Sequence, residues 1–119
     1  MRVIVCGGRT FSDKDFLWAV LDQMHSGSNP ISAVLHGAAH GADELAAQWA
    51  DARGIYQQGY EADWSTKTKW AGPLRNRLML SYGFPDLVIA FPGGKGTADM
   101  VRQARKRGVE VMQFSRDVQ

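Results

Sequence analysis

Apolar residues follow two alternating patterns along the chain. Short continuous apolar runs, typical of buried strands, occur at residues 2–6, 31–36, 55–60, 87–91 and 109–114, with the run at 55–60 the weakest. Between them, apolar residues recur every three or four positions, which predicts helices at residues 13–24, 43–53, 73–82 and 97–107. Residues 61–71 show neither period and predict a long loop that serves the function or contacts a second copy.

Strands that alternate with helices predict an α/β fold, in which a mostly parallel sheet of about five strands is covered by helices on both faces. A chain of 119 residues has the length of one domain, so residues 1–119 are expected to form a single three-layer unit. In such sheets ligands bind beyond the carboxyl ends of the strands. Any site must therefore come from the loops at that edge or from a second copy.

Glycine-rich turns follow the first, second and fourth predicted strands, and each turn opens a helix. These turns are Gly7-Gly8-Arg9, the segment from Gly37 through Gly41 to Asp43, and Pro92-Gly93-Gly94-Lys95-Gly96-Thr97. A strand, a glycine turn and a helix direct free backbone N–H groups and the positive end of a helix dipole at one point. The three turns share one sheet edge, so we expect them to meet around an anion such as a phosphate. The last turn has neither the P-loop spacing nor the full dinucleotide fingerprint, and glycine turns also serve only as tight turns.

Charged residues near these turns are the candidates for ligand contacts. Arg75 is expected in the first turn of a helix, where a cation opposes the helix dipole and so has little local stabilising role. Asp43 falls in the first turn of another helix, where it either caps backbone donors or binds the ligand. His36 and His40 flank a turn rather than sharing a helix face, so neither a metal nor another cofactor is predicted.

Composition and charge narrow the class of partner. The chain is 45% apolar and 22% charged, with a formal net charge of +2, which is ordinary for a globular protein and does not favour a nucleic acid or membrane partner. The cations from Arg102 to Arg107 are expected to complement the negative end of the last helix. Cys6, the only cysteine, is expected to be a small buried side chain. The first residues carry neither a basic leader nor a long apolar segment, so a cytoplasmic location is expected.

Several motifs together resemble a known family. They are Gly7-Gly8-Arg9-Thr10-Phe11, the segment 36–43, Ala62-Asp63-Trp64, Ala71-Gly72-Pro73-Leu74-Arg75-Asn76-Arg77 and the segment 92–97. In this order they are similar to small bacterial and phage proteins of the YspA or YpsA-related SLOG group, a domain of unknown function. That group belongs to a superfamily of Rossmann-like SMF/DprA and LOG proteins. The resemblance implies a Rossmann-like domain that binds a nucleotide or a nucleotide derivative and is frequently a homodimer.

The LOG enzymes of this superfamily carry a similar Pro-Gly-Gly-x-Gly-Thr motif and hydrolyse the N-glycosidic bond of nucleoside monophosphates. Arg75 matches the position of their catalytic arginine, but the position of their catalytic glutamate is Met100 here. The neighbouring Asp99 points about 100° away on a helix. Because cleavage builds positive charge on the sugar, it requires a carboxylate nearby. The chain therefore either uses Asp99, Asp43 or Glu44 in its place or binds without cleaving.

Three hypotheses follow. The leading one is binding of a nucleotide-like phosphate ligand, with contacts from Gly7, Gly8, Arg9, Gly37, Gly41, Asp43, Asn76, Pro92, Gly93, Gly94, Lys95, Gly96 and Thr97. The second is a phosphoribohydrolase that uses Arg75 and Asp99 as catalytic residues. The third is single-stranded DNA binding as in the DprA relatives, in which the basic end of the last helix would contact the DNA and Trp64 or Trp70 would stack on bases.

Overall fold

The computed structural model describes residues 1–66 and 68–116. Within these residues the chain forms five strands, four α helices and one short 3-10 helix, η1. The strands are β1 (Arg2–Cys6), β2 (Ala33–His36), β3 (Tyr56–Gly59), β4 (Leu87–Ala90) and β5 (Glu110–Gln113). The helices are α1 (Lys14–His25), α2 (Ala42–Ala52), η1 (Trp64–Thr66), α3 (Ala71–Gly83) and α4 (Lys95–Lys106). Every strand and helix predicted from the apolar pattern is therefore confirmed.

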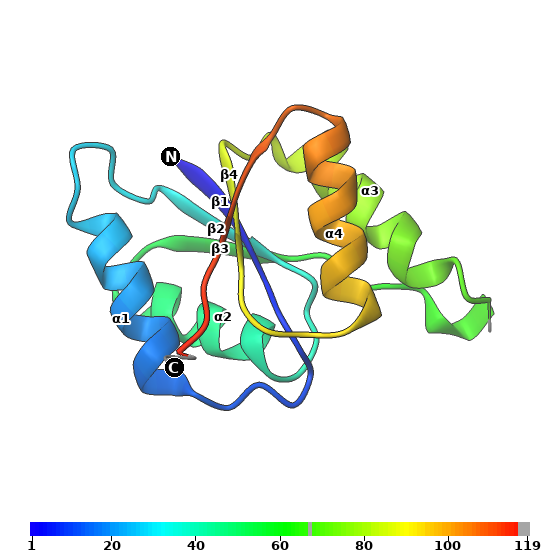
Figure 1. The fold of residues 1–119 in the computed structure, drawn as a ribbon, viewed down its shortest axis with the longest axis horizontal. Coiled ribbons are helices and arrows are strands. Elements are labelled where there is room, and N and C mark those ends of the chain that lie inside the picture. The colour runs from blue at the N-terminus through cyan, green and yellow to red at the C-terminus, as the bar shows by residue number, and fades with distance from the viewer. Residues whose placement is uncertain (67, 117–119) are drawn as a thin grey trace.

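The five strands form one sheet in the order β3-β2-β1-β4-β5 (Figure 1). All neighbouring strands are parallel, with β1 paired to β2 on one side and to β4 on the other. The strand order therefore reverses between β1 and β4, and in open α/β sheets such a reversal is where a ligand crevice opens. The single Rossmann-like α/β domain expected from the sequence is confirmed.

Helices cover both faces of the sheet, and the alternation of side chains along β1 assigns each face its partners. Val3 and Val5 point to one face, where they pack with α1 and α2 in a cluster that includes Leu17 and the fully buried Trp49. Ile4 points to the other face, in a second cluster with residues of α3 and α4. Figure 1 shows α3 and α4 together on one side of the strands. The molecule is thus a three-layer sandwich with two cores.

Two helices begin earlier than the sequence pattern predicted. Helix α4 starts at Lys95 rather than Thr97, with Gly94 as its N-cap, so Lys95 and Gly96 belong to its first turn. Helix α3 starts at Ala71, so Pro73 is its third residue instead of its first. Glycine and proline are weak helix formers that nevertheless suit a first turn, where backbone N–H groups have no partner within the helix.

The predicted apolar face of α3 is wrong for three of its four residues. Met79 is buried, but Leu74, Leu78 and Tyr82 are exposed. The helix instead buries a surface of mostly small side chains, with Ala71, Gly72, Asn76, Leu80 and Gly83 joining Met79. Gly83 lies close to Leu35 of β2, and Asn76 bonds to Gly96 and Asp99 of α4. A periodicity of large apolar residues cannot indicate such contacts. Among the described residues, no helix is long and apolar enough to cross a membrane.

Candidate functional site

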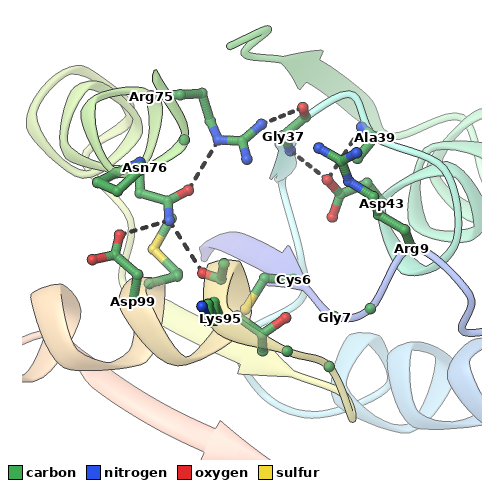
Figure 2. A pocket seen from close by; sticks show the side chains of 18 of the residues that line it. Cys6, Gly7, Arg9, Gly37, Ala39, Asp43, Arg75, Asn76, Lys95 and Asp99 are labelled. Carbon is green, nitrogen blue, oxygen red and sulfur yellow. Dashed lines mark hydrogen bonds between the residues drawn. The ribbon is translucent and has the colours of Figure 1, made fainter. Parts of the chain in front are cut away.

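A pocket of about 1080 Å³ lies at the carboxyl ends of β1 and β4, at the point where the strand order reverses (Figure 2). The turns after β1, β2 and β4 all line it, as do the first turns of α3 and α4. Its charged lining residues are Arg9, Lys69, Arg75, Lys95 and Arg102 on the positive side and Asp43 and Asp99 on the negative side. Five cations against two carboxylates favour an anionic occupant.

The turn after β4 delivers the N-terminus of α4 to this pocket. The first helical hydrogen bond runs from the N–H of Ala98 to the carbonyl of Gly94. The N–H groups of Lys95, Gly96 and Thr97 precede it and have no acceptor inside the helix. Gly93 makes the turn possible, because a Cβ there would overlap the side chain of Thr97 and the backbone of Gly8. The corner thus presents three N–H groups and the positive end of a helix dipole.

The turn after β2 is built differently. One carboxylate oxygen of Asp43 accepts hydrogen bonds from the N–H groups of Gly37 (3.1 Å) and Ala39 (3.3 Å). Burial raises the pKa of Asp43, although these two N–H groups, His36 and Arg75 act in the opposite direction. Asp43 therefore caps backbone donors, as one of its two predicted roles required, but the donors belong to the turn and not to its own helix.

Arg75 reaches across the pocket from α3 toward this turn (Figure 2). Its Nη1 donates to the carbonyls of Gly37 (2.5 Å) and Tyr60 (3.3 Å), and its Nε donates to the side-chain oxygen of Asn76 (3.0 Å). Burial lowers the pKa of Arg75, and Asp43 counteracts that shift. These bonds hold the guanidinium in place, while the residue still lines the pocket.

Asn76 connects α3 to the first turn of α4. It is 3% exposed, and its amide nitrogen donates to the carbonyl of Gly96 (3.2 Å) and to Asp99 (2.9 Å). Its oxygen accepts from Arg75, so the side chain is fully engaged within the protein. Asn76 thus links Arg75 to the first turn of α4, and it also lines the pocket.

Asp99 is also largely engaged. Its carboxylate accepts hydrogen bonds from Asn76, from Gln103 (2.7 Å) and from Arg102 (3.0 Å). Met100, at the position of the LOG glutamate, is 1% exposed and packs in the core between α3, α4 and the sheet. The carboxylate nearest the LOG catalytic position therefore serves to bind neighbouring side chains.

Aromatic residues form one rim of the pocket, whereas the sequence placed Trp64 and Trp70 in a loop and gave them a stacking role only under the single-stranded DNA hypothesis. Arg9 lies over Trp64, with its guanidinium carbon 5.2 Å from the ring centroid, and Lys69 lies 5.1 Å from the centroid of Trp70. Both tryptophans line the pocket and are about half exposed or more, at 52% and 63%. Lys69 carried no sequence signal, because it lies in a segment without periodicity.

Cys6 lies at the end of β1 and lines the base of the pocket. Burial raises the pKa of its thiol to about 12, with a further contribution from Asp43. A thiol in this state is not a nucleophile at neutral pH.

The structure brings nearly all sequence-predicted site residues to this pocket. Gly7, Gly8, Arg9, Gly37, Asp43, Arg75, Asn76, Asp99 and residues 92–97 line it. Gly41 does not. It has φ +80°, and a Cβ there would overlap the backbone of Gly8 and Arg9, so it supports the pocket from behind by packing two turns together. His36 is also structural, because its ring bonds to Gln57 (2.6 Å) and Ala38 (3.0 Å).

Comparisons with known proteins agree with this geometry. The profile of the YspA, cpYpsA-related SLOG family matches residues 1–66. The Gene 61 protein of Mycobacterium phage D29 is 37% identical over 123 residues, covering 95% of both chains. The crystal structure of DNA processing protein A (DprA) from Streptococcus pneumoniae superposes with a TM-score of 0.75 at 19% identity. That match covers 94% of this chain but only 49% of DprA, so this chain spans about half the length of that neighbour. The chain belongs to the YspA, cpYpsA-related SLOG family.

Proposed function

We propose that this protein binds a nucleotide or a nucleotide-derived phosphate at the carboxyl edge of its sheet. The observation that carries the proposal is the N-terminus of α4, which presents the N–H groups of residues 95–97 to a pocket lined by Arg9 and Arg75. A phosphate matches both the hydrogen-bond donors and the positive potential of such a corner. The pocket volume of about 1080 Å³ is slightly above the range of roughly 300–1,000 Å³ for small-molecule sites, so it has room for more than a phosphate alone.

A panel of ligands with and without the phosphate tests the proposal. AMP and ribose 5-phosphate should raise the melting temperature and give saturable heats in calorimetry, whereas adenosine should bind at least about tenfold more weakly. At a hundred times its Kd, a ligand adds roughly 2.7 kcal/mol to the free energy of unfolding. Equal binding of AMP and adenosine, or no binding of any phosphate compound, would overturn the proposal.

Cleavage of the ligand is not part of the proposal. Asp99 already accepts from Asn76, Gln103 and Arg102, and Met100 occupies the position where LOG enzymes have a glutamate. We therefore expect no free adenine when AMP is incubated with the protein. Release of adenine that disappears in Asp99→Asn would instead support the phosphoribohydrolase hypothesis.

Single-stranded DNA binding is a second candidate because positive charge continues beyond the pocket. Arg102 lines both the main pocket and an outer groove that also contains Arg105 and Lys106. The structural neighbour is described as a DNA processing protein. Oligonucleotide retention that falls steeply with salt and is lost on changing Arg105 and Lys106 to glutamine would favour this function. Binding of AMP without oligonucleotide retention would exclude it.

The proposal includes a homodimer in the cytoplasm, as expected from the sequence. Leu74, Leu78 and Tyr82 follow one another at intervals of four along α3 and are all exposed. Such a stripe is suited to a second copy of the same helix. Light scattering after size exclusion should give twice the mass of 13.1 kDa for the wild type, and Leu78→Glu should reduce it to that of one chain.

A further inference from the structure

The rim of the pocket carries a feature that a phosphate site does not require. Trp64 and Trp70 present a large apolar surface to the pocket mouth, although Trp49 shows that this chain can bury an indole completely. Large aromatic rings left half exposed beside a cavity are typical of sites that take a planar ligand group.

The surroundings of Trp64 hold its ring in position. Trp64 lies in η1, and the far edge of its ring lies next to Gly72 of α3. A Cβ built on Gly72 would be 3.4 Å from that edge, which is an ordinary contact distance. Arg9 lies over the ring and comes from the turn after β1, a separate part of the pocket wall. The indole is therefore held between two pocket elements before any ligand arrives. A platform that is already ordered loses little conformational entropy when it stacks on a ligand.

Trp70 gives the rim a second ring. Trp70 is the residue before α3, and its backbone N–H donates to the hydroxyl of Thr68 (3.2 Å). The amine of Lys69 lies over its ring. The cations of this rim, Arg9 and Lys69, add positive charge beside the aromatic surface. Stacking on tryptophan next to arginine or lysine is the means by which proteins bind bases without reading their sequence.

The pocket is thus polarised, with backbone N–H groups of α4 on one wall and tryptophans on the rim. We propose that Trp64 and Trp70 form a stacking site for the nucleobase of a nucleoside phosphate whose phosphate is held at the N-terminus of α4. This inference rests on the proposed function, because the phosphate sets where the base can lie. It deepens that function by requiring an aromatic base, so a sugar phosphate alone is an incomplete ligand.

The test compares AMP with ribose 5-phosphate, which shares the phosphate and sugar but lacks the base. Each ligand is titrated by calorimetry into the wild type, Trp64→Leu, Trp70→Leu and the corresponding phenylalanine variants. Tyr56→Leu is the matched control, because Tyr56 is also exposed, at 59%, but is not among the residues that line the pocket. Quenching of tryptophan emission gives a second readout for stacking.

We expect AMP to bind at least about tenfold more tightly than ribose 5-phosphate, a ratio within the range measured for stacking on an aromatic side chain. Each leucine variant should reduce that ratio several-fold without changing the affinity for ribose 5-phosphate. The phenylalanine variants and Tyr56→Leu should retain the ratio. UMP should bind more weakly than AMP, because its smaller ring covers less of an indole.

Other outcomes overturn the inference. Equal affinities for AMP and ribose 5-phosphate would leave phosphate binding intact but remove the stacking site. If the leucine and phenylalanine variants bind neither AMP nor ribose 5-phosphate, the tryptophans support the structure of the pocket and do not form a stacking site. A leucine variant that changes the oligomeric mass and leaves both affinities unchanged would assign that ring to a dimer interface. If neither ligand binds the wild type, the proposed function and this inference fail together.

Discussion

The turns after β2 and β4 have the same local plan but opposite chemistry. Each follows a buried strand, contains glycines and leads into a helix that lacks a side-chain N-cap. After β2, the carboxylate of Asp43 accepts from the N–H groups of Gly37 and Ala39, so the turn contains its own anion. After β4, the first turn of α4 has no acidic residue, so the turn supplies no carboxylate to the N–H groups of residues 95–97, which line the pocket. A glycine turn is thus open to an external anion only where the chain does not itself supply the anion.

The largest expected effect comes from removing the internal anion. In Asp43→Ala the N–H groups of Gly37 and Ala39 lose their acceptor, and Arg75 loses its negatively charged neighbour. Hydrogen bonds to charged groups contribute about 1.5–3 kcal/mol, so the free energy of unfolding should fall by about 2–3 kcal/mol. Urea unfolding of the wild type and the variant measures this loss in the free energy of unfolding. Asp43→Asn retains an acceptor and should lose no more than about 1 kcal/mol; equal losses in both variants would contradict the capping role.

The reverse change supplies an internal anion to the other turn. Gly96 has open space where a side chain would begin, and its position in the first turn of α4 favours a carboxylate. Gly96→Asp should therefore keep or raise the melting temperature. Repulsion should weaken AMP binding on the order of 30-fold, which is about 2 kcal/mol and below the Coulomb limit for adjacent charges near a surface.

The matched control for Gly96→Asp is Ala98→Asp. Ala98 is in the same turn of the helix but lines the outer groove, not the main pocket. That variant should bind AMP nearly as well as the wild type. Similar losses in both variants would mean that overall charge, rather than the corner itself, governs binding.

A smaller effect should follow from loosening the link between the two turns. Asn76→Ala removes the bonds to Gly96, Asp99 and Arg75, and should cost about 1–2 kcal/mol of stability. AMP affinity should fall a few-fold, because Arg75 and the first turn of α4 are then less well positioned. Gln103→Ala also removes a donor to Asp99 but has no bond to Gly96 or Arg75, so its AMP affinity should be unchanged. An equal loss of affinity in both variants would place the effect on Asp99 or on the bond that Gln103 also makes to Pro73 of α3.

The smallest effect is a pH dependence specific to the turn after β2. Burial raises the pKa of Asp43 above 3.8, so the folded state binds this proton more tightly than the unfolded chain. As pH falls from neutrality through the raised pKa toward 3.8, the wild type should gain stability relative to Asp43→Asn. The expected gain in the free energy of unfolding is roughly 1 kcal/mol or less, and urea unfolding midpoints between pH 7 and 4 measure it. Asp13 and Asp22, whose pKa values are lowered by Arg116 and Arg53, are common to both proteins and cancel. A relative loss on acidification would mean that the bonds to Asp43 outweigh its burial.

Local sequence was sufficient for the fold because the relevant signals are short. Apolar runs such as Leu87–Ala90 belong to strands with both faces covered, and spacing by three and four located the four α helices but not η1. The same spacing gave the wrong buried side for α3, where Leu74, Leu78 and Tyr82 are exposed while Asn76 and Gly83 are buried. The apolar period identifies a helix, but which side is buried depends on the neighbour that it meets.

The sequence by itself therefore determined the order of strands and helices, the three glycine turns and the sheet edge at which they would gather. Only the tertiary structure decided which turn is free to take an anion, because Asp43 and the N–H groups of Gly37 and Ala39 meet through a folded loop. It also decided that Asn76 and Asp99 bind each other and that Trp64 and Trp70 border the pocket. Backbone hydrogen-bond donors are identical at every non-proline residue, so their availability depends on which side chains the fold brings within about 3 Å of them.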